Sequence, residues 1–271
     1  MPYSANIDRK HPTCIVFLID QSESMGSPCA GAQAGRSKAA VLADQINALL
    51  AELIIECAGE TIPDLLSNIR DYLHVAVIGY GSKVQSVFGG LIPISEVEAQ
   101  ARQVNIEDPR TGASSKSQVW IEAVADGMTP MCEALAQAQM VVEEWVSAHP
   151  KCFPPIVINF TDGEANDGDP VDNARLLTGV ESADGAVLLL NGHLSSVAGG
   201  AIEFPAAPAA LPADPYARKL FEMSSVIPDS MLAQARTHGI HIDDGARGMV
   251  FNSDFNAVAN LLEMGTTMVK A

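Results

Sequence analysis

Three short polar segments of the chain carry oxygen-bearing side chains of the kind that bind a hard cation. The first contains Asp20, Ser22 and Ser24, the second contains Thr129, and the third contains Asp162. Because carboxylates and hydroxyls occur there without histidine or cysteine, the set favours an octahedral ion such as Mg²⁺ or Mn²⁺ over Zn²⁺. The oxygen-bearing side chains of these three segments are therefore candidate metal ligands.

The elements that must position these segments follow from hydrophobic periodicity. Short continuous apolar runs, typical of strands buried on both faces, alternate with patterns in which apolar residues recur at helical spacing. We expect strands at residues 14–19, 74–78, 156–160, 186–190 and 248–252, a short partner strand at 85–92, and helices at 37–57, 131–145, 170–178, 230–238 and 255–264. The alternation predicts an α/β fold: a doubly wound, Rossmann-like and mostly parallel central sheet with helices on both faces and one antiparallel edge strand.

The polar segments lie where the expected strands and helices meet. Asp20 comes directly after the run 14–19, Thr129 stands just before the helix at 131–145, and Asp162 follows the run 156–160. Loops that leave the carboxyl ends of parallel strands share one edge of the sheet. We therefore expect the candidate ligands to meet at that edge.

In these segments the chain resembles the von Willebrand factor A domains, whose metal-ion-dependent adhesion site is written D-x-S-x-S, a distant Thr and a distant Asp. Asp20, Ser22 and Ser24 match the first element, Thr129 lies in a G-x-T-P context, and Asp162 lies in a T-D-G context. The resemblance extends from about residue 13 to residue 264. It implies that the three hydroxyls bind the ion directly and that the two carboxylates hold it mainly through waters.

The resemblance also implies a function. Three neutral hydroxyl ligands would leave Mg²⁺ electron-poor, so the ion would accept an Asp or Glu carboxylate from a protein partner. The chain would then be a metal-dependent protein–protein interaction module without chemistry of its own. Cytoplasmic bacterial domains of this family resemble components of regulatory or conflict systems, and the partners implied are a protein kinase, a protein phosphatase or an AAA-type ATPase.

The domain organisation predicted is simple. Residues 1–12 form an N-terminal extension and residues 13–271 form a single domain. Between 195 and 228 the periodicity lapses into Ala, Pro and Gly, in a stretch too apolar for a free linker. Because this insertion leaves the strand 186–190 at its carboxyl end, we expect it to lie near the metal-binding edge.

Charge and composition restrict the partners. The 271 residues include 33 acidic and 16 basic side chains, which gives a formal net charge of -17. Binding of nucleic acid or anionic membrane depends on basic clusters, so neither partner is expected. With no apolar segment long enough for a membrane helix and no signal-peptide pattern at the start, we expect a cytoplasmic protein. The five cysteines show no spacing typical of a disulfide framework or a zinc site.

Two other functions remain open. A phosphoaspartyl-type phosphotransferase or phosphatase would use Asp20 as the nucleophile, but Ser22 stands where such an enzyme needs a general acid. A structural subunit would use the metal for stability alone. The segment 31–37 departs from a phosphate-binding loop in its glycine spacing and lacks the lysine, and the segment 162–173 departs from a calcium loop at its glycine and glutamate positions.

Polar residues near the candidate site have simpler interpretations. His193 follows the strand 186–190, and we expect a hydrogen-bonded histidine that closes this strand. The alternatives are a histidine that lines a ligand cleft and a catalytic triad of Ser22, His193 and Asp162. Glu164, Asp167 and Asp169 make the third segment more acidic than the motif requires. These three side chains are expected to be solvated.

Overall fold

The computed structural model describes residues 2–29, 35–58, 69–107, 114–195, 200–237 and 242–252. The helix predicted at 255–264 and most of the segment 31–37 lie outside the described residues. Within them, all five cysteines are free thiols, and no helix has both the length and the apolar character that crossing a bilayer requires.

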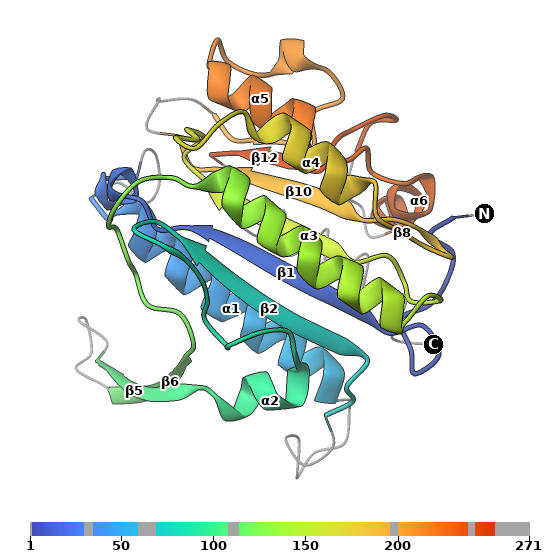
Figure 1. Ribbon diagram of the computed structural model, residues 1–271. Coiled ribbons are helices and arrows are strands. Elements are labelled where there is room, and N and C mark those ends of the chain that lie inside the picture. Colours follow the sequence, from blue (N-terminus) through green and yellow to red (C-terminus); the bar gives the residue numbers. More distant parts are fainter. Residues whose placement is uncertain are drawn as a thin grey trace.

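An eight-stranded sheet lies between two layers of helices (Figure 1). Five neighbouring strands run parallel, in the spatial order β12 (Met249–Phe251), β10 (Leu188–His193), β7 (Ile156–Thr161), β1 (Thr13–Asp20) and β2 (Leu73–Tyr80). Along the chain the strand order runs outward from β1 to β2 and then resumes on the other side with β7. The predicted doubly wound, mostly parallel α/β sheet is therefore confirmed.

Antiparallel strands lie at both edges of the sheet: the predicted antiparallel edge is confirmed beside β2, and a second one, which was not predicted, lies beside β12. On one side β3 (Val84–Ser86) and β4 (Ile92–Pro93) pair with β2, and on the other β11 (Ile202–Glu203) pairs with β12. β11 comes from the predicted insertion, whose lack of periodicity concealed it. The single strand predicted at 85–92 is interrupted, because Gly89 takes a positive φ of 79° between β3 and β4.

Helices cover both faces of the sheet. One face carries α1 (Lys38–Ala58), α2 (Ile94–Ala99) and α6 (Asp229–Thr237). The other carries α3 (Met131–Ala148), α4 (Pro170–Thr178) and α5 (Pro215–Met223). The helices predicted at 37–57, 131–145, 170–178 and 230–238 are confirmed with small shifts, whereas α2 and α5 were not predicted.

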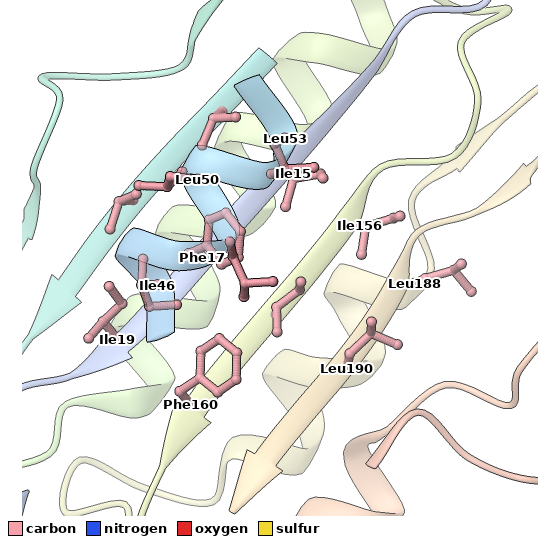
Figure 2. Packing of buried hydrophobic residues seen from close by; sticks show 14 of the residues in the cluster. Ile15, Phe17, Ile19, Ile46, Leu50, Leu53, Ile156, Phe160, Leu188 and Leu190 are labelled. Atoms are coloured by element: carbon pink, nitrogen blue, oxygen red, sulfur yellow. The ribbon is translucent and has the colours of Figure 1, made fainter. Parts of the chain in front are cut away.

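The central strand β1 is buried on both faces, as its unbroken apolar run predicts. Ile15, Phe17 and Ile19 belong to the core on the α1 side, where they lie near the apolar face of that helix, including Ile46 and Leu50 (Figure 2). The alternate residues Cys14, Val16 and Leu18 belong to the core beneath α3, α4 and α5. Successive side chains of a strand point to opposite faces, so β1 contributes to both cores and anchors the loop that follows it.

Two hairpins lie outside the central sheet. β5 (Arg102–Glu107) pairs antiparallel with β6 (Ser114–Val119), a hairpin that was not predicted because β6 has no apolar residue before Val119. β8 (Glu181–Ser182) pairs with β9 (Gly185–Ala186). The strand predicted at 186–190 therefore begins inside this second hairpin, and the sheet strand is β10 at Leu188–His193.

Candidate metal centre

Asp20 ends β1 beside β7, the place at which the strand order of the sheet reverses and at which α/β proteins bind ligands. Its side chain is 1% exposed. One carboxylate oxygen accepts a hydrogen bond from the Ser22 N–H at 2.9 Å and the other from the Thr161 hydroxyl at 2.7 Å. Burial raises the pKa of Asp20 to about 6, although the hydrogen bonds from Ser22 and Thr161 act in the opposite direction. The carboxylate is thus mostly ionised at neutral pH.

The two serines of the first segment lie on a tight turn after β1. Ser22 precedes a short 3₁₀ helix, Glu23–Gly26, whose Met25 side chain is fully buried and holds the turn against the core. The Ser22 and Ser24 hydroxyl oxygens lie 3.0 Å apart. This turn therefore presents two hydroxyls side by side and next to the Asp20 carboxylate, as the D-x-S-x-S spacing predicts.

The loop that carries Thr129 is attached to the first segment through the backbone. The Glu23 N–H donates to the Gly127 carbonyl at 3.0 Å, and the Asp126 N–H donates to the Gln21 carbonyl at 2.7 Å. Gly127 has a positive φ of 83°, and a Cβ atom there would lie 2.3 Å from the backbone nitrogen of Ser82. Glycine is required at this position, which brings buried Thr129 to the same edge as Asp20.

Asp162 follows β7 and completes the predicted set. Its carboxylate forms an ion pair with the Lys38 ammonium at 3.1 Å, and the two side chains are 9% and 4% exposed. Its negative charge is one of the influences that raise the pKa of Asp20, so the two carboxylates are within electrostatic reach of each other. The Gly163 N–H donates to the Thr161 hydroxyl oxygen at 2.9 Å, which ties this loop to the hydrogen bond between Thr161 and Asp20.

The acidic third segment is more structured than predicted. Asp167 accepts hydrogen bonds from the N–H groups of Cys132 and Glu133 and so caps α3, and Asp169 accepts one from the Val171 N–H and caps α4. Glu164, Asp167 and Asp169 are all exposed, as predicted, whereas the capping of two helices by Asp167 and Asp169 was not predicted. Glu164 is exposed and borders the candidate site.

His193 closes β10 as a buried, hydrogen-bonded histidine. Its Nε2 donates to the backbone carbonyl of Asp162 at 2.8 Å, and its ring lies edge-on to Phe251. Burial lowers the pKa of His193, so the neutral ring is favoured. Its Nε2 is engaged with a carbonyl rather than with the Ser22 hydroxyl, and the triad interpretation is not supported by this arrangement.

A cavity of about 500 Å³ opens beside the candidate ligands. On one side it is lined by Ser24, Lys38, Asp162 and Glu164, and on the other by Ser195 and the segment 212–216. Asp214 accepts hydrogen bonds from the N–H groups of Tyr216 and Ala217 and thereby caps α5. The predicted insertion thus forms one wall of the cavity at this edge.

The donor set suits a hard divalent ion. Among the described residues, no group of three His, Cys, Asp or Glu side chains could hold a metal, so the site depends on hydroxyls. Two carboxylates from different loops provide the negative charge, the Ser22 and Ser24 hydroxyls lie together beside Asp20, and Thr129 is held in the adjoining loop. Oxygen donors of this kind fit Mg²⁺ or Mn²⁺. That the five residues bind such an ion stays a prediction.

Three residues of the site were not identified from the sequence. Thr161 stands in the T-D-G context directly after the run 156–160, but the sequence does not indicate its hydrogen bond to Asp20. Lys38 lies four residues before Leu42, in line with the apolar stripe of α1, and a charged residue in that line is a signal of a buried partner. Asn166, whose side chain accepts a hydrogen bond from the Thr129 N–H, shows no sequence signal.

No family model and no curated protein matches the chain. Solved structures similar to it include the vWF domain of the type V pili tip protein Mfa5 from Porphyromonas gingivalis, with TM-score 0.34, 16% identity, and coverage of 58% of this chain and 40% of that chain. Proximal thread matrix protein 1 from the mussel byssus has TM-score 0.48 and 14% identity over 96% of this chain and 48% of that chain. The conserved hypothetical protein BatB from Bacteroides thetaiotaomicron has TM-score 0.48 and 14% identity over 96% of this chain and 100% of that chain.

The chain covers less than half the length of the first two of these structures. At such identities and TM-scores the neighbours indicate nothing about function. The chain's own features are more informative, because a Rossmann-like strand order places the Asp20, Thr129 and Asp162 loops at one edge of the sheet. The chain therefore has a Rossmann-like α/β fold, and its strand order and loop positions are those that the resemblance of its motifs to the von Willebrand factor A domains implies.

Proposed function

We propose that the chain is a divalent-metal-dependent protein interaction module. In this proposal Asp20, Ser22, Ser24, Thr129 and Asp162 hold Mg²⁺ or Mn²⁺ at the carboxyl edge of the sheet. An Asp or Glu carboxylate of a partner protein completes the coordination of the ion. The chain's own residues bind and orient, and they carry out no covalent step.

The observation that carries this proposal is the position of the buried Asp20 carboxylate. It lies beside the paired hydroxyls of Ser22 and Ser24 and within electrostatic reach of Asp162. Hydrogen bonds from Ser22 and Thr161 compensate part of the cost of burying this carboxylate, but burial still raises its pKa, so a nearby positive charge would stabilise the ionised form. A divalent ion would supply that charge, and the adjacent 500 Å³ cavity leaves room for a side chain from outside.

Metal binding can be tested by thermal melting of the wild type and of Asp20→Asn, with Mg²⁺, Mn²⁺ or a chelator. A ligand that binds only the folded state raises the melting temperature. We expect a rise with either ion in the wild type and its loss in Asp20→Asn, which keeps the size of the side chain but removes the charge. An equal response of the two proteins would contradict the assignment.

The partner can be sought by a pull-down from cell extract with the wild type and Thr129→Ala, with metal or chelator. The resemblance to cytoplasmic bacterial domains suggests a protein kinase, a protein phosphatase or an AAA-type ATPase of a regulatory or conflict system. A partner retained only by the metal-loaded wild type would support the proposal. Metal-dependent stability without any metal-dependent partner would favour the structural-subunit alternative.

The phosphoaspartyl alternative has less support in the geometry. Both oxygens of the Asp20 carboxylate accept hydrogen bonds, and the side chain is buried, whereas a nucleophile needs access to its substrate. Ser22 cannot replace a carboxylic acid as the general acid. Phosphatase turnover that disappears in Asp20→Asn would nevertheless revive this alternative.

A further inference from the structure

Lys38 is a buried cation at the candidate metal centre. It is the first residue of α1, where its N–H donates to the Ser27 carbonyl at 3.0 Å. Its ammonium lies 3.1 Å from a carboxylate oxygen of Asp162, and only 4% of its side chain is exposed. Lys38 and Asp162 both line the cavity beside Ser24. The cation thus occupies the space next to a predicted metal ligand.

This ion pair differs from the others in the described part of the chain. In every other ion pair found there, both side chains are more than one third exposed. Exposed pairs contribute little to stability, whereas a buried charge requires a partner. The carboxylate of Asp162 is therefore already neutralised by the protein itself when no metal is bound.

We propose that Lys38 is a built-in cation that competes with the divalent metal for Asp162 and so sets the metal affinity of the site. The inference rests on the proposed function, because it concerns the same centre. A metal ion that approaches Asp162 meets the repulsion of the ammonium and must draw the carboxylate away from it. The wild-type site therefore binds the ion more weakly than the same ligands would without Lys38.

The charges at the centre give this competition a role. Asp20 and Asp162 carry two negative charges and Lys38 carries one positive charge, so these three side chains and a bound divalent ion sum to +1, one unit more positive than without Lys38; Glu164 and Asp214 line the rest of the cavity. A partner carboxylate would neutralise that charge. Lys38 thus raises the affinity of the metal-loaded centre for an anion. When no anion is bound, it lowers the affinity of the centre for the metal. Metal and partner would bind cooperatively.

The test uses the full chain and Mn²⁺ or Mg²⁺ alone, titrated calorimetrically into the wild type and Lys38→Met. Methionine retains an unbranched apolar stem and removes the charge. We expect Lys38→Met to bind Mn²⁺ about tenfold more tightly or better. The control is Lys151→Met, which makes the same change of net charge at an exposed residue near the amino end of β7. It should bind Mn²⁺ as the wild type does.

The outcomes separate this inference from the proposed function. Equal or weaker Mn²⁺ binding by folded Lys38→Met, with clear binding by the wild type, would overturn the role of Lys38 alone. Absence of binding in both proteins would overturn the proposed function as well. Binding by Lys38→Met only would support the competition strongly.

Folding of the variant is a second readout. Removal of Lys38 leaves Asp162 without its cation. In the presence of a chelator we therefore expect Lys38→Met to have a lower melting temperature than the wild type, and we expect Mn²⁺ to raise its melting temperature by more. Lys38→Gln should behave in the same direction. If neither variant folds even with excess Mn²⁺, Lys38 has a structural role and the proposal fails.

Discussion

Asn166 and Thr129 hold each other through two hydrogen bonds between separate loops. The Thr129 N–H donates to the Asn166 side-chain oxygen at 2.8 Å, and the Asn166 N–H donates to the Thr129 carbonyl at 3.1 Å. The next residue, Asp167, caps α3. The loop that follows β7 therefore fixes the loop that precedes α3, and the position of Thr129 relative to Asp162 depends on Asn166.

We predict that Asn166→Ala weakens binding of Mn²⁺ without unfolding the protein. Residues that orient metal ligands typically contribute about 10- to 100-fold to metal affinity, and Asn166 is exposed, so its loss should leave the core intact. Calorimetric titration of Mn²⁺ measures the effect. Asn173→Ala on α4 is the matched control. Identical affinities of Asn166→Ala and the wild type for Mn²⁺ would show that Thr129 is positioned without the hydrogen bond from its N–H to the Asn166 side chain.

Gly163→Ala should disturb the Asp162 loop. Gly163 has a positive φ of 101°, and a Cβ atom there would lie 2.5 Å from the Tyr216 Cβ and 3.0 Å from His193 Nε2. A strained backbone of this kind costs about 1–3 kcal/mol, so the free energy of unfolding in urea should fall by roughly that amount. Gly200→Ala is the control, since a Cβ atom there meets nothing within 4 Å. Equal stabilities of the two variants would contradict the expected contact between the insertion and this loop.

A chain of polar side chains crosses the sheet beneath the metal edge. The Tyr80 hydroxyl donates to Asn159 at 2.7 Å, the Asn159 amide donates to Asn191 at 3.0 Å, and the Asn191 amide donates to the Ser224 hydroxyl oxygen at 2.9 Å. All four residues are buried. These hydrogen-bonded side chains join β2, β7, β10 and the C-terminal end of α5.

Tyr80→Phe should destabilise the protein because it leaves a buried acceptor of Asn159 without its donor. The loss of such a bond costs about 1–3 kcal/mol. Urea unfolding of Tyr80→Phe, with half-buried Tyr72→Phe as the control, measures this cost. Combining Tyr80→Phe with Asn159→Leu tests whether the two residues act as one unit. If they do, Tyr80→Phe causes no further loss of stability in the Asn159→Leu protein. Additive losses would show that the two residues act independently.

The fold and the candidate site differ in how far the sequence predicts them. Asp20 and Asp162 could be placed at one edge because each follows a mainly apolar run, interrupted only by Asn159 in the second, and such runs are strands whose carboxyl ends share an edge. The D-x-S-x-S spacing predicts the paired hydroxyls of Ser22 and Ser24 because a tight turn after a strand puts alternate residues together. Periodicity carries this information without any knowledge of the contacts between loops.

The contacts between loops could not be predicted from the sequence. Asn166 reaches Thr129 across 37 residues, and nothing in either segment indicates the pairing. The β5–β6 hairpin was missed because β6 does not alternate apolar with polar residues, and the alternation in β5 is limited to Val104 and Ile106. The helix α5 was missed because Ala and Pro precede it in a stretch without a regular period, although Asp214 followed by Pro215 is a local helix-start signal. For the pairing of Asn166 with Thr129, tertiary contacts determine the structure rather than local pattern.

A pH-dependent stability is expected from His74, at the end of the sheet opposite the metal edge. The centroid of its ring lies 4.7 Å from that of the Trp145 ring, and the His149 ring stacks on the Trp145 ring at a centroid distance of 3.9 Å. Burial lowers the pKa of His74 and His149 adds to this effect, while Asp71 and Glu96 act in the opposite direction.

The sign of the effect follows from the lowered pKa of His74. Below the ordinary histidine value of 6.5 the unfolded chain binds the proton more readily than the folded protein, so protonation favours unfolding. The contribution of His74 to stability is present at higher pH and is lost as the pH falls through this range. In the presence of a chelator, the free energy of unfolding of the wild type should decrease more, or increase less, from about pH 7.5 to 5.5 than that of His74→Gln, because Asp20, whose pKa is raised to about 6, contributes with the opposite sign in this range. His11→Gln, in the N-terminal segment, is the control, and an unchanged pH dependence in His74→Gln would show that His74 does not contribute to it.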